Sequence, residues 1–448
     1  MSPDQDFTIL PGVAWPPSLW AAVTPPGAAL PVLDASVTTD VIVIGAGFTG
    51  LSTAIHLRDM GVGVIVVEAA EPGWGASGRN NGQVIPTLAG SDPSGMVARH
   101  GAAGERFNAL LRDSAVYLFD FIRQHSIAAE AQQSGWVQPV HSPGRIKIAE
   151  KRVREWSAMG ARVELLDKAA VGRMLGSEAW YGGFWNPTGG HINPLALSRG
   201  LAATASDKGA LIYARSPVSN FVHNGKRWQV KTPKGSVSAP ALVLATNAYT
   251  GEFSKSLMPA IAQEVVPVRS WQMATQPISA NIAKTIIPDR QAMSDTHREL
   301  YFARWDARGR LVTGGAAVRP GVEGAALRRA VASRLQRLWP QLGDIQFDYV
   351  WNGYVGMTPD NVLRPELPGY PRAHKLGPRG FAWTGCNGRG VALSVSLGRE
   401  LARATQGALD SELAMPFSAP TPRAYNGVLR RIAPLALPYY RYLDSKEI

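Results

Sequence analysis

A glycine motif near the N-terminus constrains this chain more than any other feature. Residues 45–50 read Gly-Ala-Gly-Phe-Thr-Gly, directly after the apolar run 40–44 and before a segment of helical periodicity at 51–60. A second apolar run follows at 64–67 and ends in Glu68. Strand, glycine turn, helix and second strand form one βαβ unit, so the order predicts a parallel sheet that binds a dinucleotide.

Each part of the motif has a physical role in holding a dinucleotide. Gly45 permits the tight turn, Gly47 lets a pyrophosphate approach the backbone, and Gly50 allows the helix to pack closely on the strand. The helix N-terminus presents free N–H groups to phosphate. The carboxylate of Glu68 can accept hydrogen bonds from ribose hydroxyls. The alternative is a purely structural glycine turn, and the motif alone does not separate FAD from NAD.

Two further glycine-rich segments favour FAD. Residues 73–83 follow the second strand and would lay backbone amides and short polar side chains over the dinucleotide. Residues 385–390 lie between a predicted strand at 381–384 and a predicted helix at 391–405. That helix would direct its positive end at the carbonyl edge of a flavin ring. A surface loop and a tight turn are the alternatives for the two segments, but a dehydrogenase that uses only NAD would need neither.

Composition limits the other classes of function. The net charge is +12, from 46 Lys and Arg against 34 Asp and Glu, but the basic residues are scattered, which favours a solvated surface over a nucleic-acid site. Cys386 is the only cysteine, so no intramolecular disulfide can form, and we expect a cytoplasmic protein. The eight histidines are isolated, so no metal site is predicted. We find neither a secretory signal nor an apolar run long enough to span a membrane.

A chain of 448 residues exceeds one ordinary core, and its strand patterns indicate two interleaved domains. Buried-strand patterns of the Rossmann kind occur at 40–68, 239–245 and 381–405, separated by long stretches of different character. We therefore predict an α/β fold with a Rossmann-type FAD-binding domain and an α+β substrate domain built on a large mixed or antiparallel sheet. The expected parts are an arm at 1–37, the FAD domain at 38–90, 190–250 and 350–410, the substrate domain at 91–189 and 251–349, and a tail at 411–448.

Several segments along the chain carry a family resemblance: residues 19–22, 73–75, 80–86, 189–194, 351–360 and 385–390. Through them the chain resembles the D-amino-acid oxidase (DAO) superfamily, and within it the γ-glutamylputrescine oxidase and L-pipecolate oxidase group. This resemblance implies FAD at the interface of the two domains. It also implies that Val218 contacts the adenine through its backbone.

The motifs and the resemblance together predict a set of cofactor-binding residues. They comprise the βαβ fingerprint, the two glycine-rich segments and the end of the strand near 245. The set is Gly45, Gly47, Phe48, Thr49, Gly50, Glu68, Ala69, Gly75, Ala76, Ser77, Arg79, Asn80, Asn81, Gly82, Gln83, Val218, Thr246, Asn247, Gly385, Asn387, Gly388, Arg389, Gly390 and Val391.

The implied reaction is oxidation of a C–N bond by hydride transfer to the flavin, after which the imine product hydrolyses. Such chemistry depends on positioning a neutral amine, so no single base is predicted. The candidates near the reacting atoms are His191, Tyr301 and Trp351, with buried structural roles as the alternative. Arg298 and Arg304 are candidates for binding an anionic substrate, with ordinary surface positions as the alternative.

Three positions depart from relatives within the superfamily. Gly353 stands where some relatives attach the flavin to a cysteine, so the FAD is expected to be non-covalent. Val312 stands where sarcosine-oxidase-like members have a lysine that assists oxygen. Val355 stands where glycine-oxidase-like members bind the substrate carboxylate with an arginine. These departures favour a polyamine derivative such as γ-glutamylputrescine, or a cyclic amino acid such as pipecolate, over a simple α-amino acid.

The sequence leaves two alternatives for the electron acceptor. The first is O₂, reduced to H₂O₂. The second is a quinone or carrier protein, reached by a dehydrogenase whose basic tail at 411–448 contacts a membrane surface. Two weaker alternatives remain: a basic nucleic-acid-binding protein, supported by charge alone, and an NAD-linked reductase without flavin.

Overall fold

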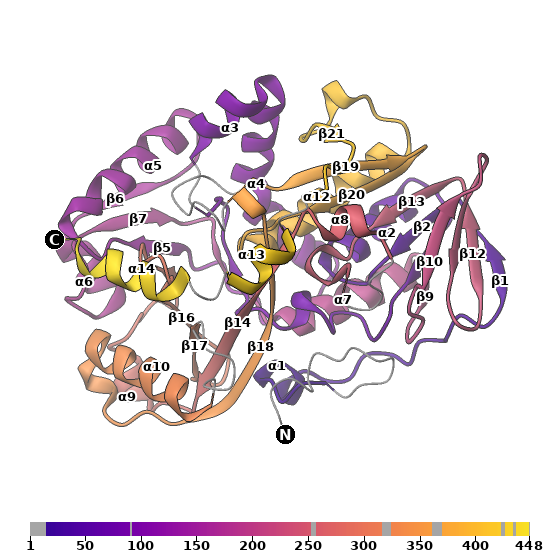
Figure 1. The fold of residues 1–448 in the computed structure, drawn as a ribbon. Coiled ribbons are helices and arrows are strands. Elements are labelled where there is room, and N and C mark those ends of the chain that lie inside the picture. Colours follow the sequence, from indigo (N-terminus) through magenta and orange to yellow (C-terminus); the bar gives the residue numbers. More distant parts are fainter. Residues whose placement is uncertain are drawn as a thin grey trace.

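The computed structural model describes residues 15–89, 92–251, 257–315, 324–360, 370–422, 426–432 and 436–447. Two large sheets organise the chain, and Figure 1 shows them side by side, each with its own covering elements. This arrangement confirms the predicted α/β class with a second, sheet-based region.

The first large sheet has seven strands and carries the βαβ unit. Its order is β21-β19-β20-β13-β2-β3-β9, and the neighbours from β20 to β9 pair in parallel. Every residue of β2, β3, β13 and β20 is buried, as expected for strands covered on both faces. The strands are β2 (Val41–Ile44), β3 (Val64–Val67), β9 (Leu211–Tyr213), β13 (Ala241–Leu244), β19 (Arg372–Gly377), β20 (Gly380–Thr384) and β21 (Phe417–Ser418).

Alternate residues of this sheet face two different layers. Val41 and Val43 pack into the core formed with helices α2 (Phe48–Asp59), α4 (Ala102–Gln124) and α12 (Gly390–Thr405). Ile42 and Ile44 pack on the opposite side, against a four-stranded sheet that Figure 1 shows at the edge of the molecule. That sheet comprises β1 (Ser36–Thr38), β12 (Ser236–Ala239), β11 (Trp228–Lys231) and β10 (Asn220–His223), in this order.

The second large sheet has eight strands in the order β18-β14-β17-β16-β15-β5-β7-β6. Only β15 and β5 pair in parallel, so the sheet is mixed but mainly antiparallel, as predicted. Helices α6 (Lys168–Leu175) and α10 (Ala325–Leu338) pack on its core. The strands are β5 (Trp136–Pro139), β6 (Glu164–Leu166), β7 (Gly183–Asn186), β14 (Val266–Thr275), β15 (Ala292–Ser294), β16 (Phe302–Trp305), β17 (Leu311–Gly315) and β18 (Phe347–Met357).

One predicted boundary cuts through a strand. Residue 350 lies inside β18, which pairs with β14 along nearly its whole length. The sequence did not show this pairing because β14 lies far away in the chain. The division into domains stays a prediction.

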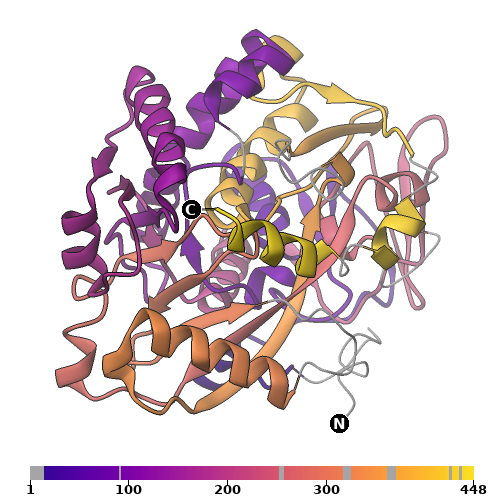
Figure 2. The same cartoon turned by 60° about the vertical axis from the view of Figure 1, so that its left-hand side comes forward.

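The predicted arm and tail both contain regular structure. In the arm, α1 (Leu19–Val23) buries Trp20, and β1 joins the four-stranded sheet. In the tail, β21 extends the seven-stranded sheet, and α13 (Asn426–Ile432) and α14 (Ala436–Ser445) follow. Figure 2 brings α14, drawn in yellow, to the front of the molecule.

The remaining elements connect the sheets or cover them. Within the described ranges, no helix combines the length and apolar character needed to cross a bilayer. These elements are β4 (Gln83–Val84) with its partner β8 (Gly190–His191), and the helices α3 (Pro93–His100), α5 (Ile146–Ala158), α7 (Pro194–Asp207), α8 (Pro259–Ala262) and α9 (Ala280–Ala283).

A buried histidine on β19 makes the stability of this fold depend on pH. The His374 side chain is buried and pairs with the hydroxyl of Thr384 at 2.8 Å, and burial lowers its pKa to about 4. An unfolded histidine has a pKa of about 6.5. The stabilisation from neutral His374 is thus present above pH 6.5 and is lost as the pH falls toward 4. We predict that His374→Gln narrows the difference in unfolding free energy between pH 7 and pH 5, measured by urea denaturation. An unchanged difference would contradict this assignment.

Candidate active site between the two large sheets

A pocket lies where the carboxyl ends of the parallel strands meet the eight-stranded sheet. Ile44, Val67 and Ala245 line it from the ends of β2, β3 and β13. Ser270 and Phe302 line it from β14 and β16 of the other sheet. Ligands of open parallel sheets bind at this edge, so the position alone marks a candidate site.

The glycine turn has no room for side chains. Gly45 has φ +104°, in the left-handed region, and a Cβ on Gly50 would lie 1.9 Å from the Gly45 carbonyl oxygen. A Cβ on Gly47 would lie 2.8 Å from the hydroxyl of Ser77. That hydroxyl accepts a hydrogen bond from the Phe48 amide at 3.0 Å. The turn thus leaves the N-terminus of α2 facing the pocket, where it suits an anion.

Glu68 fixes the same turn and reaches the pocket. Its carboxylate accepts hydrogen bonds from the amides of Ala46 at 2.7 Å and Ala70 at 2.9 Å. Burial raises the pKa of Glu68, while these backbone amides favour the ionised form. The side chain lines the pocket beside Ala69 and Val218, where it can accept hydrogen bonds from a ribose.

The 73–83 segment is held by its own side chains. The Asn80 side-chain oxygen accepts from the Gly82 amide at 2.8 Å, and that of Asn81 accepts from the Gln83 amide at 2.9 Å. Gln83 donates to the Met293 carbonyl at 2.9 Å, while its side-chain oxygen is buried without a hydrogen-bond partner among the described residues. Gln83 lines the pocket, so this acceptor is suited to a polar ligand.

The 385–390 segment brings a buried cation to the pocket. Arg389 is the N-cap of α12, and its guanidinium donates to the Ser294 hydroxyl at 3.3 Å and lies over the Trp136 ring. Burial lowers the pKa of Arg389 to about 9, and the like charge of Arg152 adds to this effect. Arg389 is therefore a cation at neutral pH, and no carboxylate of the described residues pairs with it.

Most residues expected to bind the cofactor line this pocket. Four of them, Gly50, Gly82, Gly385 and Asn387, lie outside the lining. The others are Gly45, Gly47, Phe48, Thr49, Glu68, Ala69, Gly75, Ala76, Ser77, Arg79, Asn80, Asn81, Gln83, Val218, Thr246, Asn247, Gly388, Arg389, Gly390 and Val391.

The three catalytic candidates do not line the pocket. His191 is buried on β8 and bonds the Arg290 carbonyl through Nε2 at 3.1 Å, and burial holds its pKa well below the usual range. Trp351 donates its indole N–H to the Arg79 carbonyl at 2.8 Å. Tyr301 stacks on His297 with ring centroids 4.0 Å apart.

The two arginines proposed for substrate binding are also engaged elsewhere. Arg304 is fully buried and donates to the carbonyls of Asn81 at 2.7 Å and Ile192 at 2.9 Å, and burial lowers its pKa to about 10. It thus supports the 73–83 segment from behind. Arg298 forms ion pairs with Asp444 and Glu447 of the C-terminal segment. Neither arginine reaches the lining.

Sequence reasoning missed the wall that the eight-stranded sheet provides. On β14, Ser270 and Gln272 line the pocket while Trp271 and Met273 pack in cores, and this alternation was a usable signal. Leu300 gave no such signal, because it enters the lining through an irregular turn. The lining residues that were not predicted include Tyr249, Ser270, Gln272, Ser294, Leu300, Phe302 and Tyr354.

The three positions that depart from relatives lie in different surroundings. Gly353 and Val355 line the pocket from β18. Val312 instead packs in a core cluster with Trp20 and Trp351 and is not part of the lining.

Comparison with known proteins agrees with this geometry. γ-Glutamylputrescine oxidoreductase of Escherichia coli K12 is 29% identical, over 87% of this chain and 89% of that protein. The probable oxidoreductase OrdL of Haemophilus influenzae is 30% identical, over 91% and 92%. Solved structures of P. horikoshii L-proline dehydrogenase and Geobacillus kaustophilus glycine oxidase share the fold, each with a TM-score of 0.68 and 18% identity, over 85% and 82% of this chain and 95% of each of those chains.

The family model described as "DAO: FAD dependent oxidoreductase" matches residues 40–404. This match spans the βαβ unit, both glycine-rich segments and most of both large sheets. The chain therefore belongs to the DAO family of FAD-dependent oxidoreductases.

Proposed function

We propose that this protein oxidises a C–N bond of a small amine or amino acid, using FAD held non-covalently in the pocket between the two large sheets. The observation that carries the proposal is that one pocket runs without interruption from Glu68 and the glycine turn to the polar and aromatic wall of the eight-stranded sheet. FAD, when bound, supplies the hydride acceptor for the amine. Names of relatives support the substrate class, since one of them is a γ-glutamylputrescine oxidoreductase.

Three groups of residues would each hold a different part of the cofactor. Glu68 and the backbone of Val218 would hold the ribose and adenine. The glycine turn at Gly47 and the N-terminus of α2 would hold the pyrophosphate, with the Ser77 hydroxyl, which already accepts from the Phe48 amide, free to donate to it. The 80–83 and 388–391 segments would hold the ring, with the unpartnered oxygen of Gln83 available as an acceptor.

Non-covalent attachment has support at two positions. Gly353 offers no side chain to the pocket wall, and its Cβ position faces Arg79 at 3.2 Å. Cys386 lines the pocket, but burial raises the pKa of its thiol. A neutral thiol is a poor nucleophile, so Cys386 has little tendency to attack a flavin.

The substrate end favours a small molecule that carries an anionic group. Ser270, Gln272 and Phe302 provide a neutral wall, and Arg389 adds a positive charge beside Ser294 that no carboxylate of the described residues pairs with. A buried cation is costly without an anion, so a substrate carboxylate would be stabilised there. The α-carboxylate of a cyclic amino acid and the carboxylate of a γ-glutamyl amine share this chemistry.

Two electron acceptors are compatible with the site. O₂ with release of H₂O₂ is the first. The lining contributed by the described residues contains no lysine, and this favours the second, an electron carrier or quinone served by a dehydrogenase.

Replacing Glu68 tests the cofactor site. Glu68→Gln removes the charge from a carboxylate that we expect to bind ribose hydroxyls, and such a change costs about 1.5–3 kcal/mol, or roughly tenfold to a hundredfold in FAD affinity. The control is Glu71→Gln, which removes a partly exposed partner of Arg215 at the surface. Fluorescence titration of the FAD-free protein measures both. Equal affinity of Glu68→Gln and the unmodified protein would contradict the assignment.

The substrate class is tested by anaerobic addition of candidate compounds to the FAD-loaded protein. The set is γ-glutamylputrescine, L-pipecolate, D- and L-proline, sarcosine and simple polyamines. We expect one of the first two to bleach the flavin absorbance. Admitting air then separates an oxidase, which recolours rapidly, from a dehydrogenase. A flavin that none of these amines reduces would refute the proposed reaction.

The role of Arg389 is tested by comparing pipecolate with piperidine, which differ by the carboxylate alone. Loss of one charge-assisted pair predicts that Arg389→Gln weakens pipecolate binding by about tenfold or more and leaves piperidine binding nearly unchanged. Arg389→Lys, which keeps the charge, should retain part of the affinity. Equal losses for both compounds would instead indicate that Arg389 acts on the flavin.

A further inference from the structure

A strained turn brings one apolar side chain into the pocket. Residues 295–301 connect β15 to β16, and Ser294, Leu300 and Phe302 of this hairpin line the pocket. Leu300 has φ +56°, in the left-handed region that branched residues avoid. Such a conformation persists only where the surroundings hold it, so the contacts of the turn explain how Leu300 stays in the wall.

Inside the protein, Asp295 fixes the turn. This carboxylate is fully buried and accepts hydrogen bonds from the amides of His297 and Tyr301, each at 3.0 Å. It also pairs with His297 Nδ1 at 2.5 Å. These bonds close the base of the turn but do not touch its tip at 298–300.

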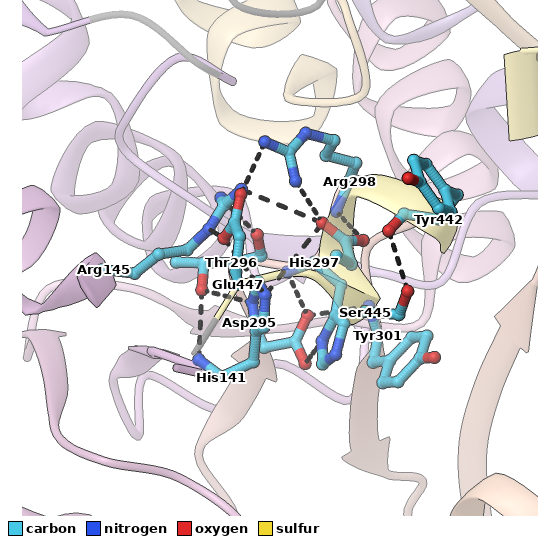
Figure 3. A network of polar contacts seen from close by, with 11 residues as sticks. His141, Arg145, Asp295, Thr296, His297, Arg298, Tyr301, Tyr442, Ser445 and Glu447 are labelled. Atoms are coloured by element: carbon cyan, nitrogen blue, oxygen red, sulfur yellow. Dashed lines mark hydrogen bonds and ion pairs between the residues drawn. The ribbon is translucent and has the colours of Figure 1, made fainter. Parts of the chain in front are cut away.

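The C-terminal segment holds the tip. The Arg298 amide donates to Asp444 at 2.9 Å, and its guanidinium binds Asp444 at 2.5 Å and Glu447 at 2.6 Å. Beside it, Arg441 of α14 forms two hydrogen bonds with Glu299, at 2.5 and 2.8 Å. The two residues immediately before Leu300 are thus both bound by α14 and the residues after it, and Figure 3 shows Arg298 beside Glu447.

Arg145 and His141 connect the C-terminal segment and the turn to the rest of the protein. Arg145 binds Glu447 and donates to the Thr296 carbonyl at 2.7 Å. His141 stacks on His297 with centroids 3.9 Å apart (Figure 3). His141, Asp444 and Glu447 lie close enough to suggest a metal site, but two guanidinium groups already bind these carboxylates. The cluster is therefore an ion-pair clamp.

We propose that α14 and the residues after it clamp the 295–301 turn and so hold Leu300 in the wall of the substrate pocket. Arg298, Asp444 and Glu447 are then positioning residues for the reaction, although they touch neither substrate nor cofactor. The proposal rests on the proposed function for its effect on turnover. Release of the clamp would let Leu300 leave its strained conformation, which opens the substrate end and leaves the FAD contacts in place.

The test replaces Arg298 in the full-length, FAD-loaded protein. Arg298→Gln breaks the partly buried pairs with Asp444 and Glu447, and Glu299→Gln breaks only the single pair with Arg441, as a second variant. The control is Arg123→Gln, which removes an exposed ion pair with Asp120 on α4. Amide hydrogen exchange of residues 294–302 and quenching of flavin fluorescence by acrylamide are measured for each. Both readouts need bound FAD but no substrate.

We expect Arg298→Gln to speed exchange at 294–302 and to raise acrylamide quenching, each by at least about threefold, because the tip then opens locally. Glu299→Gln should show the same changes to a smaller extent, and Arg123→Gln none. With the substrate found above, KM should rise by about fivefold or more while kcat stays within about twofold, as expected when binding alone is lost. Leu300→Ala should reproduce the quenching and the KM change without altering exchange in α14.

Several results would overturn the clamp. One is faster exchange in α14 with unchanged protection of 294–302 and unchanged quenching, which would mean that the helix only stabilises the surface. Another is wild-type quenching in Leu300→Ala. A flavin that no amine reduces would refute the proposed reaction instead, and the exchange and quenching data would still decide the clamp.

Discussion

The structure depends on polar groups that are buried at the junction of the two large sheets. The N-terminus of α2 and the guanidinium of Arg389 face one pocket, together with the side-chain oxygens of Gln83 and Gln272, which have no hydrogen-bond partner among the described residues. Burial of such groups without partners is costly, and a dinucleotide with a polar ring edge would satisfy them together. The same buried groups therefore connect the packing of the two sheets with the proposed cofactor site.

Hydrogen bonds across the junction hold the cofactor-binding segment in place. Trp351 donates to the Arg79 carbonyl, Arg304 donates to the Asn81 carbonyl, and Gln83 reaches the Met293 carbonyl on β15. From the N-terminal arm, Trp20 donates to the Asn80 carbonyl at 2.8 Å. Trp351, a catalytic candidate, and Arg304, a candidate for substrate binding, thus both donate to the backbone of the segment on which the cofactor would lie. The C-terminal clamp has a similar supporting role at the opposite wall of the pocket, because it holds the turn that carries Leu300.

Local signals predicted the parts of this molecule that local physics determines. The glycine turn, the strands buried on both faces and the acid after β3 each require particular residues, so the Rossmann-type region and most of the pocket lining at the cofactor end could be read from sequence. The position of a side chain or strand that depends on distant partners could not be predicted in this way. The sequence does not reveal that Arg304 donates to the carbonyls of Asn81 and Ile192. Nor does it reveal that Arg298 forms an ion pair with Asp444, or that β18 pairs with β14. The left-handed backbone conformation of Leu300 could not be predicted either, because a leucine gives no signal for that conformation.

The central claim is that the pocket between the sheets holds one non-covalent FAD. The most direct measurement is the absorbance spectrum of the purified protein, recorded before and after acid precipitation. We expect flavin bands in the native protein and their complete transfer to the supernatant, in a ratio of about one flavin per chain. A colourless protein that does not take up added FAD would contradict the claim. Flavin that stays with the precipitate would show instead that the attachment is covalent.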